Sequence, residues 1–281
     1  MAWIAVVLFV VGLSFGSFVN ALVWRLHERS AGKKGSTKLK TGNLSIINGR
    51  SMCPNCRHTL AWYDLIPLAS WLMLRARCRY CKKPISSQYP LVELTAGLVF
   101  ALSYLFWPEI VGHDGQWLLL GTWLASFIGL LALAVYDLRW TILPSRIVYP
   151  TLAVAAIGRI AYIAAYQPHK LHAVGLWVAS VAVASGIFWF LYTFSKGKWI
   201  GYGDVRLGLI TGTLLAGPDK SFLMIFLASI IGTLVATPAL VSGRKTMASR
   251  LPFGPFLIAA TAVVIVFGGP ILDWYTGLFG L

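Results

Sequence analysis

Long apolar stretches alternate with short polar junctions along most of the chain. A helix needs about 20 mostly apolar residues to cross a bilayer, so this pattern predicts an all-α polytopic membrane protein with about eight transmembrane helices. We expect them at residues 2–24, 91–108, 117–136, 146–166, 172–194, 205–217, 221–241 and 254–279. The sixth stretch is short, and the pattern defines its limits least sharply.

Composition supports a membrane protein. Apolar residues make up 58% of the 281 residues and charged residues 12%, and the mean hydropathy is +0.73, far above the value typical of a soluble domain. The first apolar stretch has no basic residue before it and is too long for the apolar region of a signal peptide. We therefore expect it to remain as a transmembrane helix.

The net charge of +15 is distributed unevenly. If the eight helices alternate in direction, 21 of the 24 Lys and Arg residues share one side, and the exceptions are Arg159, Lys170 and Lys220. Basic residues concentrate in cytoplasmic loops, which places the long loop after the first helix in the cytoplasm and both termini outside. Topology and attraction to anionic lipids explain the basic charge, and no aromatic RNA-binding motif accompanies it, so we expect no nucleic-acid partner.

All four cysteines lie in this loop, as Cys53-Pro-Asn-Cys56 and Cys78-Arg-Tyr-Cys81. Two C-x-x-C pairs separated by 21 residues are typical of a structural zinc site, since each tight turn supplies two thiolates. Disulfides are the alternative, but a cytoplasmic loop stays reduced. Redox activity of one pair is a further alternative, although no thioredoxin-like pattern surrounds either pair.

The segment 60–74 between the cysteine pairs is apolar but too short to cross the membrane. It carries Asp64 and Pro67, and we expect it to lie at the bilayer surface or to be re-entrant. The polar tract from Glu28 to Arg50 has the composition of a flexible segment. The predicted domain layout is a first transmembrane helix, 1–24, a cytoplasmic zinc loop, 25–90, and a seven-helix membrane domain, 91–281.

Asp137 and Asp204 lie at the ends of apolar runs, each followed closely by a basic residue. They fall on the same side of the predicted topology. Two carboxyls held close together share a proton, which is the arrangement of aspartic proteases. The alternative is two boundary turns in which each Asp caps a helix or meets lipid headgroups.

Three further features attract attention. Gly12 and Gly16 on the first helix would permit close approach of another helix. Glu93, near the start of the second, suits the helix dipole in the first turn, or contacts a substrate amine or cofactor. The run Leu251-Pro-Phe-Gly-Pro-Phe256 either forms a wall of the aspartate site or starts the last helix.

Several of these motifs, taken in order, resemble those of the type IV prepilin peptidases, a family of G-x-G-D membrane aspartyl proteases. The motifs are Gly16-Ser-Phe-Val-Asn20 with Arg25, the cysteine pairs, Trp62-Tyr-Asp-Leu-Ile-Pro67 with Ser70-Trp71, Glu93-Leu-Thr-Ala-Gly97, Asp137 with Leu143-Pro144, Gly201-Tyr-Gly-Asp-Val-Arg-Leu207 and Pro252-Phe-Gly-Pro-Phe256. Ser145 departs from the pattern, because an acidic residue is frequent there.

The resemblance implies that Asp137 and Asp204 are catalytic and that the substrates are prepilins or type II pseudopilins, cleaved at the cytoplasmic face of a prokaryotic inner or cytoplasmic membrane. It also implies N-methylation of the new amino terminus with S-adenosylmethionine, served by the cysteine loop, and Glu93 is the weak candidate for a cofactor contact. The remaining alternative is a transporter or assembly scaffold whose aspartates bind ions and whose zinc loop docks a partner.

Overall fold

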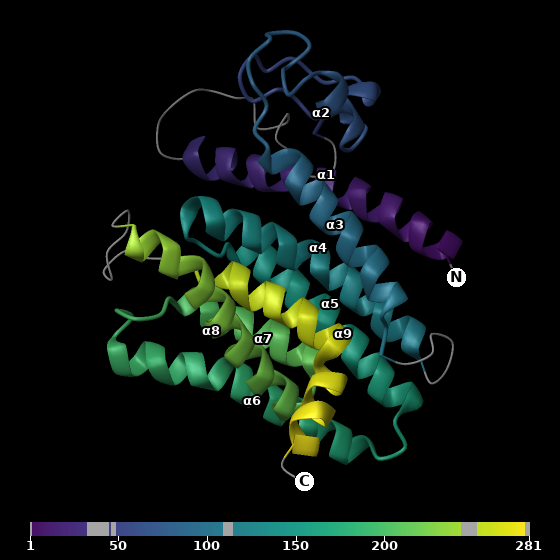
Figure 1. The fold of residues 1–281 in the computed structure, drawn as a ribbon, viewed down its shortest axis with the longest axis vertical. Coiled ribbons are helices and arrows are strands. Elements are labelled where there is room, and N and C mark those ends of the chain that lie inside the picture. The colour runs from purple at the N-terminus through teal and green to yellow at the C-terminus, as the bar shows by residue number, and fades with distance from the viewer. Residues whose placement is uncertain (1, 33–44, 46–48, 109–114, 243–251, 279–281) are drawn as a thin grey trace. The chain divides into compact units, whose positions relative to one another are not determined.

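A computed structural model describes residues 2–32, 45, 49–108, 115–242 and 252–278. The described chain is almost entirely helical (Figure 1). Its elements are α1 (Ala2–Gly32), η2 (Trp62–Leu65), α2 (Ala69–Met73), α3 (Gln88–Leu105), α4 (Gln116–Trp140), α5 (Ser145–Tyr166), α6 (Lys170–Ser195), α7 (Tyr202–Leu215), α8 (Pro218–Val241) and α9 (Gly254–Leu278). Each of the eight apolar stretches expected to be helical forms a helix, namely α1 and α3 to α9.

Six of the described helices are long and apolar enough to cross a membrane, namely α1, α4, α5, α6, α8 and α9. Two further predicted spans form the shorter helices α3 and α7, which have 18 and 14 residues. At a rise of 1.5 Å per residue, α7 is only about 21 Å long, whereas the hydrocarbon core of a bilayer is about 30 Å thick.

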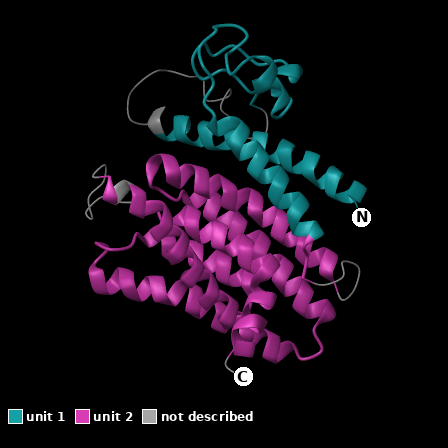
Figure 2. Ribbon diagram, in the orientation of Figure 1, with its two compact units in different colours: residues 1–105 teal, residues 106–281 magenta. Residues whose placement is uncertain are grey.

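The chain forms two compact units, residues 1–105 and 106–281 (Figure 2). In the first, α1 packs along α3. A Cβ added to Gly16 would lie 2.5 Å from the Cα of Glu93, and one added to Gly12 would lie 2.6 Å from the carbonyl oxygen of Ala96. The prediction that these two glycines permit close helix packing is confirmed.

The loop of the first unit contains two short helices, η2 and α2, within the segment 60–74, and neither buries a residue. In the preceding tract, α1 continues to Gly32, and Arg25 donates hydrogen bonds to the carbonyls of Ser45 and Gly49, at 3.0 and 2.8 Å. Residues 33–44 and 46–48 of the tract predicted to be flexible lie outside the described residues.

The second unit is built around α4, in which every residue from Leu130 to Asp137 is buried. Both α5 and α9 pack on α4, and the short α7 packs against α5, α6, α8 and α9. A Cβ on Gly208 of α7 would lie 2.4 Å from the carbonyl oxygen of Ala184 in α6, so this contact requires glycine. The helix α4 ends at Trp140, before Pro144, which occupies the N-cap of α5.

Candidate active site and cysteine cluster

Asp137 and Asp204 come together inside the second unit. Asp137 lies in the last turn of α4 and is 6% exposed. Asp204 lies in the first turn of α7, is half-buried, and accepts a hydrogen bond from the backbone N–H of Gly201, the N-cap residue. The two carboxyls are close enough to interact electrostatically, although 67 residues separate them in the sequence.

The start of α9 closes this site. The backbone N–H of Gly254 donates a hydrogen bond to the carboxyl of Asp137. A Cβ on Gly254 would lie 2.7 Å from Asp137 Oδ2 and 3.6 Å from Leu207 Cδ2 of α7. Both interpretations of the run 251–256 hold for Gly254, which begins α9 and also lies beside the Asp137 carboxyl, whereas Leu251 lies outside the described residues.

Arg206 follows Asp204 closely in the sequence, but in the described part of the chain it forms no ion pair with either aspartate. Arg206 donates a hydrogen bond from its guanidinium to the hydroxyl of Ser145, at 2.8 Å, and lies 4.8 Å from the centre of the Tyr202 ring. This contact joins the start of α7 to the start of α5. Asp204 lies in the first turn of its helix but is not the capping residue, which is Gly201. Asp137 is buried in the last turn of its helix, where a carboxylate is unfavourable.

The four cysteines form a cluster in the loop of the first unit. All four are free thiols, and their sulfur atoms lie within 4.8 Å of one another. The sulfurs of Cys53 and Cys81 are 3.9 Å apart, close to the separation of about 3.8 Å between thiolates bound tetrahedrally to zinc at 2.3 Å. The donor set and its spacing fit a structural metal.

The two C-x-x-C turns repeat the same backbone pattern. The N–H of Cys53 donates to the carbonyl of His58 and that of Cys78 to the carbonyl of Lys83, while Arg57 and Lys82 both have a positive φ, of 60° and 59°. Isolated bridges flank both turns, Met52 with Thr59 and Arg77 with Pro84. The turns are thus built as equivalent halves of one site.

Backbone donors also point at the sulfurs. The N–H groups of Asn55 and Cys56 reach Cys53, and those of Tyr80 and Cys81 reach Cys78. Burial opposes ionisation of Cys78, but these donors and the neighbouring thiols outweigh it and lower its pKa. Burial raises the pKa of Cys53.

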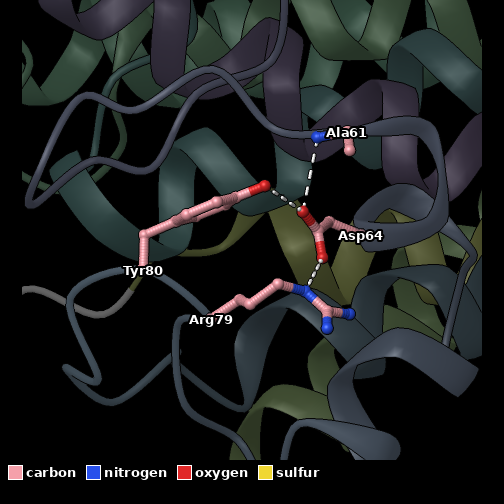
Figure 3. Close-up of polar contacts among 4 residues, drawn as sticks. All are labelled: Ala61, Asp64, Arg79 and Tyr80. Carbon is pink, nitrogen blue, oxygen red and sulfur yellow. Dashed lines mark hydrogen bonds and ion pairs between the residues drawn. The ribbon is translucent and has the colours of Figure 1, made fainter.

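Asp64 ties the segment between the turns to the second turn, a role that the sequence analysis missed. Figure 3 shows its carboxylate accepting hydrogen bonds from Arg79 Nε at 2.8 Å, the Tyr80 hydroxyl at 3.1 Å and the Ala61 N–H at 3.3 Å. Burial opposes ionisation, but these donors hold the pKa of Asp64 below its ordinary value. The sequence did contain a signal for this role, since Asp64 is the one carboxylate in the apolar segment 60–74 and a buried charge needs hydrogen-bond or ionic partners.

Glu93 also has a different position from the one expected. The helix α3 begins at Gln88 and has no acidic residue in its first turn, so the helix-dipole interpretation is wrong. The carboxylate is 7% exposed and accepts hydrogen bonds from the backbone N–H of Leu68, at 2.9 Å, and from the hydroxyl of Ser17. Glu93 therefore fastens the segment 60–74 to α3 and α1.

The fold and these two sites define a helical multi-pass membrane protein with an aspartate pair inside its second unit and a four-cysteine cluster. Comparison with known families gives two matches, to the bacterial peptidase A24 N-terminal domain over residues 10–107 and to the type IV leader peptidase family over residues 124–237. No solved structure matches the chain.

The chain belongs to the type IV leader peptidase family. It is 35% identical, over 88% of its length and 87% of the relative's, to the type 4 prepilin-like proteins leader peptide-processing enzyme of Escherichia coli O78:H11. It is 30% identical to the prepilin leader peptidase/N-methyltransferase of Stutzerimonas stutzeri, covering 95% and 91% of the two chains. The candidate spans and these relatives indicate a multi-pass protein of the bacterial inner membrane, and they do not favour a transporter or scaffold.

Proposed function

We propose that this protein is a membrane-embedded aspartyl endopeptidase that removes the leader of type IV prepilins or type II pseudopilins and then methylates the new amino terminus. The observation that carries the peptidase is the meeting of Asp137 and Asp204 within the second unit, in a chain whose relatives bear prepilin peptidase names. Asp137 and Asp204 are the catalytic residues of this proposal.

In the proposed reaction, one carboxyl of the pair is ionised and the other keeps its proton, because two negative charges held close together repel each other. The carboxylate takes a proton from a water molecule as its oxygen attacks the scissile carbonyl carbon. The protonated carboxyl polarises the carbonyl oxygen. Collapse of the tetrahedral intermediate breaks the C–N bond, and a proton passes to the departing nitrogen. The N–H of Gly254 orients the Asp137 carboxyl.

The proposed topology has eight spans, with α3 and α7 added to the six longer helices. Both termini lie outside, and the loop 25–90 and the aspartate pair face the cytoplasm. The support is the charge distribution, since 21 of the 24 basic residues then lie on the cytoplasmic side. A substrate with a basic leader and an apolar helix would meet the pair at this boundary.

We assign a structural zinc ion to Cys53, Cys56, Cys78 and Cys81, whose spacing fits it. Bound there, it would hold the two turns together and supply no reactive group.

The domain layout keeps the loop 25–90 as the part associated with methylation and 91–281 as the protease. S-adenosylmethionine is the methyl donor, and Glu93 remains the candidate contact. Because Glu93 already binds Leu68 and Ser17, no methyl-transfer step is assigned to it.

The test is co-expression with a prepilin that has a basic leader and a glycine before the cleavage site, followed by the intact mass of the pilin. We expect a mass that lacks the leader and carries one added methyl group. Loss of the leader alone supports the peptidase and contradicts the methyltransferase. An unprocessed pilin, with two different substrates, contradicts the proposed function.

A further inference from the structure

The second unit contains a cavity of about 270 Å³ at the end of α7 that is remote from the aspartates. It is lined by residues from the last turn of α7, including Thr213 and Leu214, and by Gln116 at the start of α4. Gln116 and Asp137 are 21 residues apart on one helix, a rise of about 32 Å. The cavity and the proposed catalytic pair therefore lie at opposite ends of α4.

The short helix α7 ends at this cavity. The helix has 14 residues, whereas α4, α5, α8 and α9 have 22 to 25, so α7 is shorter than these helices by about 12 Å or more. The last carbonyls of a helix have no partner within the helix. Here the guanidinium of Arg159 donates to the carbonyls of Thr213, at 3.3 Å, and Leu214, at 2.7 Å.

Two positive charges face this cavity. Arg159 lines it from α5 and Lys220 from the first turn of α8. Arg159 uses only two of its five N–H donors on the α7 carbonyls, and within the described part of the chain Lys220 forms no hydrogen bond or ion pair. Among the residues that the structure describes, the cavity lining contains the amides of Gln116 and Gln167 but no acidic residue.

The same two residues are exceptions in the charge distribution, because they do not lie on the basic side of the predicted topology. A topology signal does not explain them. A cation within a span, such as Arg159, is costly unless it is paired, and the described lining residues supply no carboxylate. Arg and Lys are the side chains that bind phosphate oxygens, and the cavity exceeds by several times the roughly 30 Å³ that one water molecule fills.

We propose that this cavity binds a phosphate group, with Arg159 and Lys220 as its two cationic contacts. A phosphate can come from the headgroup of a phospholipid or from a free phosphate ion, and both present the same oxygens to these side chains. The site is separate from the proposed peptidase chemistry, so it does not depend on the proposed function.

The first experiment measures lipid binding to the purified, delipidated full chain by native mass spectrometry. Phosphatidylglycerol is compared with diacylglycerol that has the same acyl chains but no phosphate. A parallel arm follows the thermal unfolding midpoint in inorganic phosphate against chloride at equal ionic strength. Preference for phosphatidylglycerol identifies a lipid headgroup, whereas a shift with phosphate and no lipid preference identifies a soluble anion. Either result supports the proposed site if the lipid preference or the phosphate-dependent shift is weakened when Lys220 is replaced.

The decisive variant is Lys220→Gln, which removes a charge without removing a described contact. We expect it to weaken binding of the preferred ligand by about tenfold, the effect of losing one charged hydrogen bond. The matched control is Lys170→Gln, which makes the same change at an exposed residue of the same predicted side that does not line the cavity. It should bind as the wild type does.

Arg159→Lys gives a second test that keeps a cation but loses the fork of donors, and it should also weaken binding. Prepilin processing should be unchanged in Lys220→Gln, because the residue lies at the other end of the unit. Equal binding by the wild type, Lys220→Gln and Arg159→Lys would overturn the proposal. So would equal binding of phosphatidylglycerol and diacylglycerol combined with no phosphate-dependent shift.

Discussion

The cysteine cluster and the aspartate pair are built in different ways. Each cysteine turn is shaped by hydrogen bonds between residues five apart, such as Cys53 with His58, and only the meeting of the two turns requires longer contacts. The aspartate site joins the end of α4, the start of α7 and Gly254 of α9, which belong to three separate helices. A local sequence motif can specify the first kind of site, whereas the second exists only when a bundle is packed.

The strongest test of this difference removes a carboxyl. Asp137→Asn and Asp204→Asn should each lower the cleavage rate by about 10²–10⁴-fold, the contribution of a general acid or base. The double variant should be little worse than either single variant, because the two groups act as a unit. Intact-mass analysis of the pilin measures cleavage, and Asp219→Asn, at an exposed residue of the same unit, is the control. Wild-type processing in either single variant contradicts the assignment.

The second test removes the metal. The wild type should contain about one zinc per chain, and Cys53→Ser combined with Cys78→Ser should contain almost none, because both turns lose a thiolate. Elemental analysis of the purified protein gives the ratio. Cleavage should persist, since both aspartates belong to the second unit. Met73→Ser, at an 81% exposed position of the same loop, should keep its zinc, and zinc in the double variant would refute the four-cysteine site.

The third test changes the wall of the aspartate site. In Gly254→Ala the added Cβ would lie 2.7 Å from Asp137 Oδ2, so the carboxyl must move. A displacement of about 1 Å at a catalytic group can cost up to about 100-fold in rate, and we expect a loss of about 10- to 100-fold in cleavage with normal protein levels. Gly269→Ala, on the same helix with open space around it, should cleave normally. Equal rates for the two variants would mean that Gly254 does not position Asp137.

The smallest expected effect concerns Ser145. Replacing it by Asp would turn its hydrogen bond with Arg206 into an ion pair. Ser145 is exposed, so the stabilisation should be only about 0.2–1 kcal/mol, and cleavage should hardly change. Thermal unfolding at low and high salt measures this, because the gain should fade as salt screens the pair. Ser145→Asn is the neutral control, and a gain of the same size in it would exclude an ion pair.

The sequence by itself determined the helices, because apolar runs of this length have few alternatives, and it determined the cysteine cluster, because two C-x-x-C turns carry their own geometry. It also identified Asp137 and Asp204 as unusual carboxyls. The tertiary structure decided which groups surround them. The hydrogen bond of Gly254 to Asp137, the contacts of Glu93 with Leu68 and Ser17, and the cavity of Arg159 and Lys220 all join helices or loops distant in sequence. Such contacts depend on how the helices pack against one another and on how long they are. Hydrophobic periodicity predicts that a helix forms, but it does not predict which residue of another helix a given side chain contacts.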